Sequence, residues 1–140
     1  MKTLFPAFRV SDLDVALGFY TALGYDVVGN IDVGGGTRLA MLALPEEPDV
    51  SLELVHRPAD GRVDPGGFDH LAVQADDLDA TRERLLARGL RPSDVELPGG
   101  LDGPRTAWLV DPDGYRIELV QWPLGHPVGM TRADFTDQPS

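Results

Sequence analysis

The chain has 140 residues, 42% of them hydrophobic and 25% charged, which fits one globular domain with its own core. Its net charge of −11 argues against nucleic-acid binding, which requires a basic surface. No apolar run approaches the roughly 20 residues of a membrane span, and residues 1–10 lack a signal-peptide pattern, so a cytoplasmic location is expected. The absence of cysteine excludes disulfides and thiolate chemistry but leaves a metal site of histidine and carboxylates open.

The second half of the chain repeats the first at a constant offset. Asp12-Leu13-Asp14 recurs as Asp77-Leu78-Asp79, and Glu53-Leu54-Val55 recurs as Glu118-Leu119-Val120. These identities fall in order and without a gap, so the sequence is predicted to be a duplicated module.

The first module is predicted to begin with a strand over residues 5–10, followed by a helix. Ser11 is the expected N-cap of that helix and Gly24 its C-terminal stop. Three strands are predicted next, at about residues 26–31, 38–44 and 50–56. The helix carries apolar residues at the spacing of one face: Leu13, Ala16, Leu17 and Tyr20.

The second module repeats this plan. Its elements are predicted at residues 70–75 (strand), 78–88 (helix), 94–97 (a weaker strand), and 106–110 and 115–122 (strands). Pro112-Asp113-Gly114 supplies a tight turn between the last two.

Together the elements predict an α+β fold of two tandem βαβββ modules, forming a cup-shaped, half-open eight-stranded sheet. Module one covers residues 1–60 and module two residues 68–122, within a single domain over residues 1–125, and a linker over residues 58–67 joins them. Residues 123–140 form a C-terminal tail, in which His126 is interpreted as a surface turn residue.

Three polar side chains interrupt apolar strands and are predicted to share a face. Alternation sends Glu53, His70 and Glu118 to the side of each half-sheet that the helix leaves uncovered, whereas His56 falls on the other side. Taken singly, each suits a solvated face. Taken together, an imidazole and two carboxylates suit a borderline divalent cation. Phe5 occupies the repeat-equivalent position of His70.

These residues carry a resemblance to a known family. Residues 8–14 with Phe19-Tyr20, then Leu52-Glu53-Leu54, His70 and Ile117-Glu118-Leu119, resemble glyoxalase I of the glyoxalase, bleomycin-resistance and extradiol dioxygenase superfamily, over about residues 3–122.

The resemblance implies a homodimer that binds a small molecule, with metal sites at its interface and two ligand positions from each chain. Glu53, His70 and Glu118 match three of the four ligand positions. The remaining position, normally His or Gln, is Phe5. The implied cofactor is a divalent metal (nickel, zinc, manganese or iron), bound by three ligands or lost because of Phe5. One histidine and two carboxylates argue against an extradiol dioxygenase, because those enzymes need two histidines and one carboxylate.

The leading functional hypothesis is a metal-dependent, lactoylglutathione lyase-like enzyme that acts on a small carbonyl or hemithioacetal substrate by proton transfer through an enediolate. Glu118 is the general base by family analogy, with Glu53 as the alternative. Phe5, Arg9 and Arg57 are the candidate substrate-binding residues. Arg9 matches an arginine that contacts the carboxylate of glutathione in the family, whereas Arg57 replaces the usual asparagine and so argues against glutathione.

Two alternatives remain open at this point. One is a non-catalytic dimer of the bleomycin-resistance type, which would sequester a cationic small molecule, as Phe5 and the net charge favour. The other is a different metal-assisted reaction, such as epimerisation, at the same residues.

Overall fold

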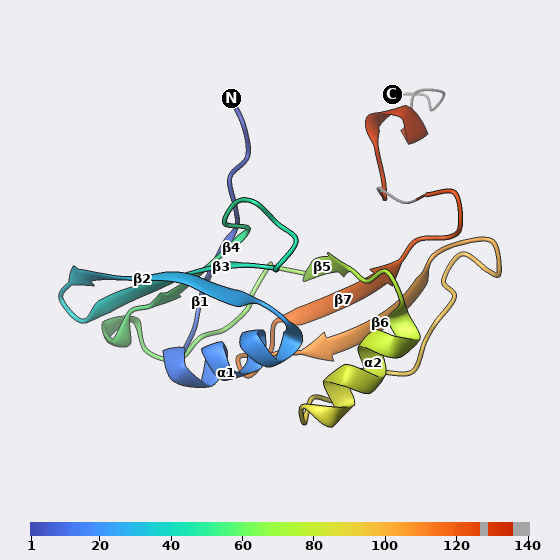
Figure 1. Ribbon diagram of the computed structural model, residues 1–140. Coiled ribbons are helices and arrows are strands. Elements are labelled where there is room, and N and C mark those ends of the chain that lie inside the picture. The colour runs from blue at the N-terminus through green and yellow to red at the C-terminus, as the bar shows by residue number, and fades with distance from the viewer. Residues whose placement is uncertain (127–128, 136–140) are drawn as a thin grey trace.

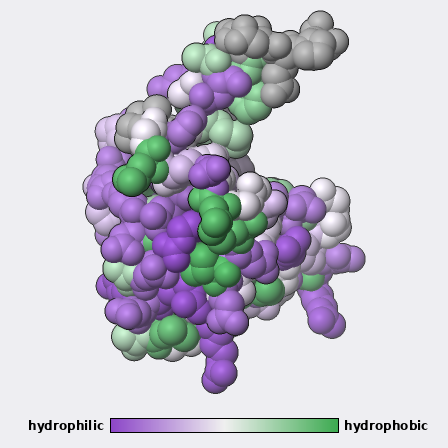
Figure 2. All heavy atoms as spheres, turned by 90° about the vertical axis from the view of Figure 1, so that its right-hand side faces the viewer, coloured by the Kyte–Doolittle hydropathy of each residue, from purple (hydrophilic) through white to green (hydrophobic). Residues whose placement is uncertain are grey.

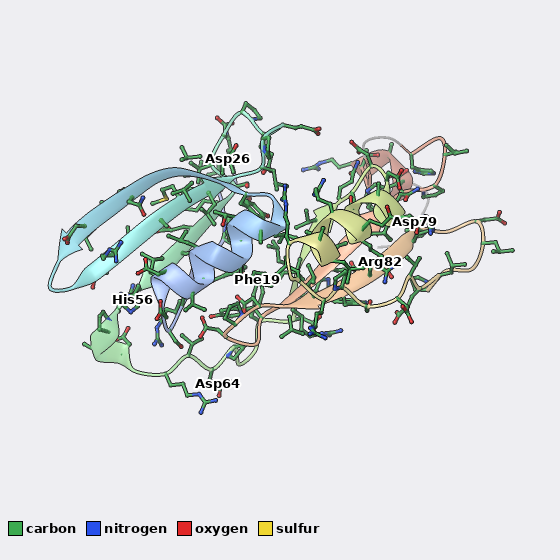
Figure 3. All side chains as sticks on the ribbon, turned by 60° about the horizontal axis from the view of Figure 1, so that its bottom comes forward. Phe19, Asp26, His56, Asp64, Asp79 and Arg82 are labelled. Carbon is green, nitrogen blue, oxygen red and sulfur yellow. The ribbon has the colours of Figure 1, made fainter. Side chains whose placement is uncertain are left out.

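The computed structural model describes residues 1–126 and 129–135, and within them the strands form two sheets (Figure 1). The first sheet holds β1 (Ala7–Arg9), β4 (Leu52–His56), β3 (Thr37–Ala43) and β2 (Asp26–Gly34), in that spatial order. The second holds β5 (His70–Gln74), β7 (Arg116–Gln121) and β6 (Arg105–Val110). Figures 1 and 3 show helices α1 (Leu13–Leu23) and α2 (Leu78–Ala87) on the same side of the two sheets. The predicted α+β class is confirmed.

The internal repeat is visible in the strand pairing. β1 pairs parallel with β4 so that Ala7 lies opposite Glu53. β5 pairs parallel with β7 so that Ala72 lies opposite Glu118. The same register at repeat-equivalent positions means that each sheet presents equivalent side chains to its uncovered face.

The strand predicted over residues 94–97 is nearly absent, so the described residues form sheets of four and three strands and not one eight-stranded cup. The segment makes a single bridge, between Glu96 and Thr106. Ser93 accounts for part of the loss, because its hydroxyl accepts from the backbone N–H of Trp108 at 2.8 Å. That bond occupies a donor that a longer strand ladder would use.

The start of the first module also differs from the prediction. Asp12, not Ser11, is the N-cap of α1, and its carboxylate accepts from the backbone N–H of Val15 at 3.0 Å. The Ser11 hydroxyl instead accepts from the N–H of Val63 at 3.2 Å, which ties the linker to the helix start. β1 begins only at Ala7, since Pro6 has no N–H to donate to a ladder.

A buried polar network joins the modules. Tyr20 on α1 is fully buried and donates its hydroxyl to Asp111 at 2.8 Å. The other carboxylate oxygen of Asp111 accepts from the backbone N–H groups of Asp113 and Tyr115, each at 2.9 Å. The Tyr115 hydroxyl donates to the carbonyl of Arg9 at 2.9 Å. Burial raises the pKa of Asp111 and of Tyr20, so the network keeps the tyrosine protonated as the donor.

One face of the molecule is mostly polar. Figure 2 shows hydrophilic side chains over most of this face, interrupted by a central apolar patch and smaller apolar areas. In the part of the chain that the structure describes, no helix is long and apolar enough to cross a membrane.

Candidate functional site

Glu53 and Glu118 are placed by the burial of their strand neighbours. The side chains on either side of each glutamate are 0 to 1% exposed and belong to the core: Leu52, Leu54, Ile117 and Leu119. Successive strand residues point to opposite faces. Both glutamates therefore project from the sheet faces that α1 and α2 do not cover.

His70 and Glu118 come together on the uncovered face of the second sheet. His70 Nε2 lies 3.7 Å from Glu118 Oε1. On the other side of the ring, Nδ1 lies 2.5 Å from Asp69 Oδ2. A carboxylate only accepts, so Nδ1 carries the proton in this bond. The bond lowers the pKa of Asp69 and leaves the Nε2 edge of the ring facing Glu118.

Trp108 and Arg116 complete this cluster, and neither was selected from the sequence. Trp108 on β6 lies directly opposite Glu118, and its ring centroid is 5.1 Å from that of His70. The Arg116 guanidinium lies 4.1 Å above the Trp108 ring. Arg116 stands two residues before Glu118, so strand alternation alone would have placed it on the same face.

Within one chain Glu53 lies on a different sheet from His70 and Glu118, so the predicted metal set would need residues from two chains. Glu53 lies on β4 of the first sheet, opposite Met41 on β3. Among the described residues, no group of three or more histidine, aspartate or glutamate side chains is placed to hold a metal ion. The reason is architectural: the two sheets lie beside each other and do not face each other (Figures 1 and 3).

The predicted substrate-binding residues lie at the two ends of the β1–β4 pair, Phe5 before its start and Arg9 and Arg57 near its far end. Phe5 is half-buried just before β1. Arg9 donates to the carbonyl of Gly61 at 3.2 Å, and its Nε lies 3.7 Å from Asp60. Arg57 donates to the same Asp60 carboxylate at 3.4 Å. Both arginines are therefore tied to the short helix η1 (Pro58–Asp60), apart from the His70 cluster.

The two remaining histidines stand apart from the cluster. His56 ends β4 and lies in the first module (Figure 3). The backbone N–H of His126 donates to the carbonyl of Pro123 at 3.1 Å, which places His126 in a turn. A cleft of about 1150 Å³ opens between the modules, beside β5 and α2, but none of the predicted site residues lines it.

Comparison with known proteins gives the family. The Glyoxalase/Bleomycin resistance protein/Dioxygenase superfamily matches residues 4–119. A probable lactoylglutathione lyase of Synechocystis is 34% identical over 127 residues, covering 86% of this chain and 95% of that protein.

Solved structures share the fold. Glyoxalase I from Zea mays has a TM-score of 0.75 and 29% identity, over 86% of this chain and 44% of that one. A bleomycin resistance determinant encoded on transposon Tn5 has a TM-score of 0.65 and 26% identity, over 86% of this chain and 98% of that one. The chain belongs to the glyoxalase, bleomycin resistance protein and dioxygenase superfamily. The similarity to lactoylglutathione lyases supports a lyase-like enzyme.

Proposed function

We propose that the chain is a glyoxalase I-like lyase or isomerase that moves a proton between adjacent carbons of a small carbonyl or hemithioacetal substrate. The observation that carries this proposal is the pair formed by His70 and Glu118, 3.7 Å apart on an uncovered sheet face. A carboxylate that is only partly exposed beside a fixed imidazole is suited to taking a proton from carbon and returning it.

The residues of the second sheet fit half of a divalent-metal site. His70 offers Nε2 on the side of Glu118, and Asp69 holds the other ring nitrogen. A histidine that ligates a metal usually donates its second N–H to a carboxylate or carbonyl in this way. When bound, a nickel, zinc, manganese or iron ion would polarise the substrate carbonyl.

The third donor is proposed to come from Glu53 of a second copy. One chain keeps Glu53 on a different sheet from His70 and Glu118, so a complete site needs the first sheet of one copy to face the second sheet of another. Phe5 adds no donor at the remaining position. Glu118 is assigned as the base, Glu53 as the alternative, and Trp108 as a wall that keeps water from the reacting carbons.

The protein is expected to form a dimer in solution. β2 exposes large apolar side chains over 46 to 59% of their surface: Val28, Ile31 and Val33. An exposed apolar strand at the edge of a sheet favours association with another chain. Light scattering should give twice the 15.1 kDa of one chain. A monomer at micromolar concentration would contradict the proposal that two copies share the site.

Phe5→His tests whether the site is a metal centre. If Glu53, His70 and Glu118 bind a metal, the added imidazole supplies a fourth ligand and is expected to raise nickel or zinc affinity by about tenfold or more. Calorimetric titration of the wild type and Phe5→His measures this difference, with Phe5→Leu as a control that adds no donor. Equal metal affinity in all three proteins would contradict the metal assignment.

A non-catalytic binder of a cationic small molecule is the second candidate. Three observations favour this candidate. Phe5 occupies a position where a metal ligand is expected, the Trp108 ring lies beside the His70 cluster, and the net charge is −11. In that case Phe5→His is expected to weaken binding of the organic cation by about 1–3 kcal/mol, because buried aromatic area is lost. Titration with a bleomycin-type drug tests this candidate, and unchanged or absent binding would exclude it.

A further inference from the structure

We propose that Arg116 binds a carboxylate group of the substrate, so that the site selects carbonyl compounds that carry a negative charge close to the reacting carbonyl. This inference rests on the proposed function, because it assumes that the substrate lies over His70 and Glu118.

The position of Arg116 is set by strand register. Arg116 lies directly opposite His70 in the parallel pairing of β5 with β7, and it precedes Glu118 by two residues. Paired residues, and residues two apart on one strand, point to the same face. Arg116 therefore projects over the cluster formed by Asp69, His70 and Glu118.

The side chain of Arg116 is held by stacking and not by ion pairing. Its guanidinium carbon lies 4.1 Å from the centroid of the Trp108 ring, and this ring in turn packs edge-on against His70. Stacking on an aromatic face restrains the guanidinium plane and leaves the N–H groups at its edge available.

Those N–H groups have no partner among the described residues. Some arginines donate to protein groups: Arg9 to Gly61, Arg82 to Ser93, Arg88 to Ala22 and Arg105 to Asp79. Arg116, like the exposed Arg84, makes no such hydrogen bond or ion pair with the parts of the chain that the structure describes, and it differs from Arg84 in lying on the Trp108 ring beside His70. The pKa of Asp69 is lowered mainly by its hydrogen bond with His70, and the positive charge of Arg116 contributes to the same shift.

The negative charge around Arg116 makes its guanidinium the group that would select an anionic substrate. The chain carries a net charge of −11, and Asp69 and Glu118 place two carboxylates in the cluster itself. Without Arg116, an anionic substrate would meet like charges on this face. A restrained guanidinium with a free edge instead matches a carboxylate through two parallel hydrogen bonds.

Tryptophan fluorescence gives a binding assay that does not depend on turnover. The chain has two tryptophans, so Trp122→Phe leaves Trp108 as the sole reporter, in contact with Arg116. The probes are pyruvate and pyruvamide, which share the oxo group and differ in charge. The variants are Arg116→Gln and, as a charge-matched control, Arg84→Gln on the exposed surface of α2, each in the Trp122→Phe background.

Arg116→Gln is expected to weaken pyruvate binding by about tenfold to a hundredfold and to change pyruvamide binding by less than about twofold. Arg84→Gln should affect neither. Equal weakening of both probes, unchanged pyruvate binding in Arg116→Gln, or no preference of the wild-type site for pyruvate would overturn the assignment. The assay reads binding alone, so absence of proton transfer would contradict the proposed function without deciding this result.

Discussion

Glu118→Gln is expected to lower the rate of substrate proton exchange by about a hundredfold to ten-thousandfold, because an amide cannot accept the proton removed from carbon. Exchange of the substrate C–H in deuterated water, followed by NMR, measures this step directly. A suitable probe is a hemithioacetal formed from an α-oxoaldehyde and a thiol. Exchange by Glu118→Gln at the wild-type rate would exclude Glu118 as the base.

Glu53→Gln is the matched control, because Glu53 occupies the repeat-equivalent position and both residues are proposed ligands. Either substitution weakens the proposed metal site, so metal content must be measured by elemental analysis beside the exchange rate. Saturating metal is expected to restore exchange in Glu53→Gln and not in Glu118→Gln. The opposite pattern would transfer the role of base to Glu53.

Asp111→Ala is expected to lower the free energy of unfolding by about 3 kcal/mol. The change leaves the Tyr20 hydroxyl and the backbone N–H groups of Asp113 and Tyr115 without their acceptor. Asp111→Asn keeps an oxygen for the two backbone donors and should cost about 1 kcal/mol. Urea denaturation gives both values. An alanine variant as stable as the asparagine variant would show that the network contributes little.

The stability difference between wild type and Asp111→Asn is expected to depend on pH. Burial raises the pKa of Asp111 in the folded state, so the folded chain holds this proton more tightly than the unfolded chain does. The resulting stabilisation is fully present below the unfolded pKa of about 3.9. It is lost as the pH rises through the raised pKa of the folded state. Urea titrations at several pH values should therefore show that, as the pH falls, the free energy of unfolding of the wild type rises relative to that of Asp111→Asn. A constant difference would contradict the raised pKa.

The sequence was sufficient to predict the faces of the site residues. Strand alternation and the internal repeat placed Glu53, His70 and Glu118 on uncovered faces because side-chain direction along a strand is a local property. The parallel registers of Ala7 with Glu53 and Ala72 with Glu118 follow the same repeat.

The distance between the two sheets could not be predicted in this way. It is fixed by contacts between residues far apart in the chain, such as Tyr20 with Asp111 and Tyr115 with Arg9, and periodicity carries no information about them. The stacking of Arg116 on Trp108 also depends on the pairing of β6 with β7, which becomes certain only when the register is known.

A mixing experiment tests most directly the central claim that one site combines Glu53 of one copy with His70 and Glu118 of another. At limiting metal concentration, Glu53→Gln and His70→Ala are each expected to be inactive alone. After the two proteins are unfolded together and refolded, half of the dimers should be mixed and each should hold one intact site, which restores about a quarter of the wild-type exchange rate. Recovery to that level is the predicted result. No recovery in dimers shown by mass spectrometry to be mixed would contradict a site shared between chains.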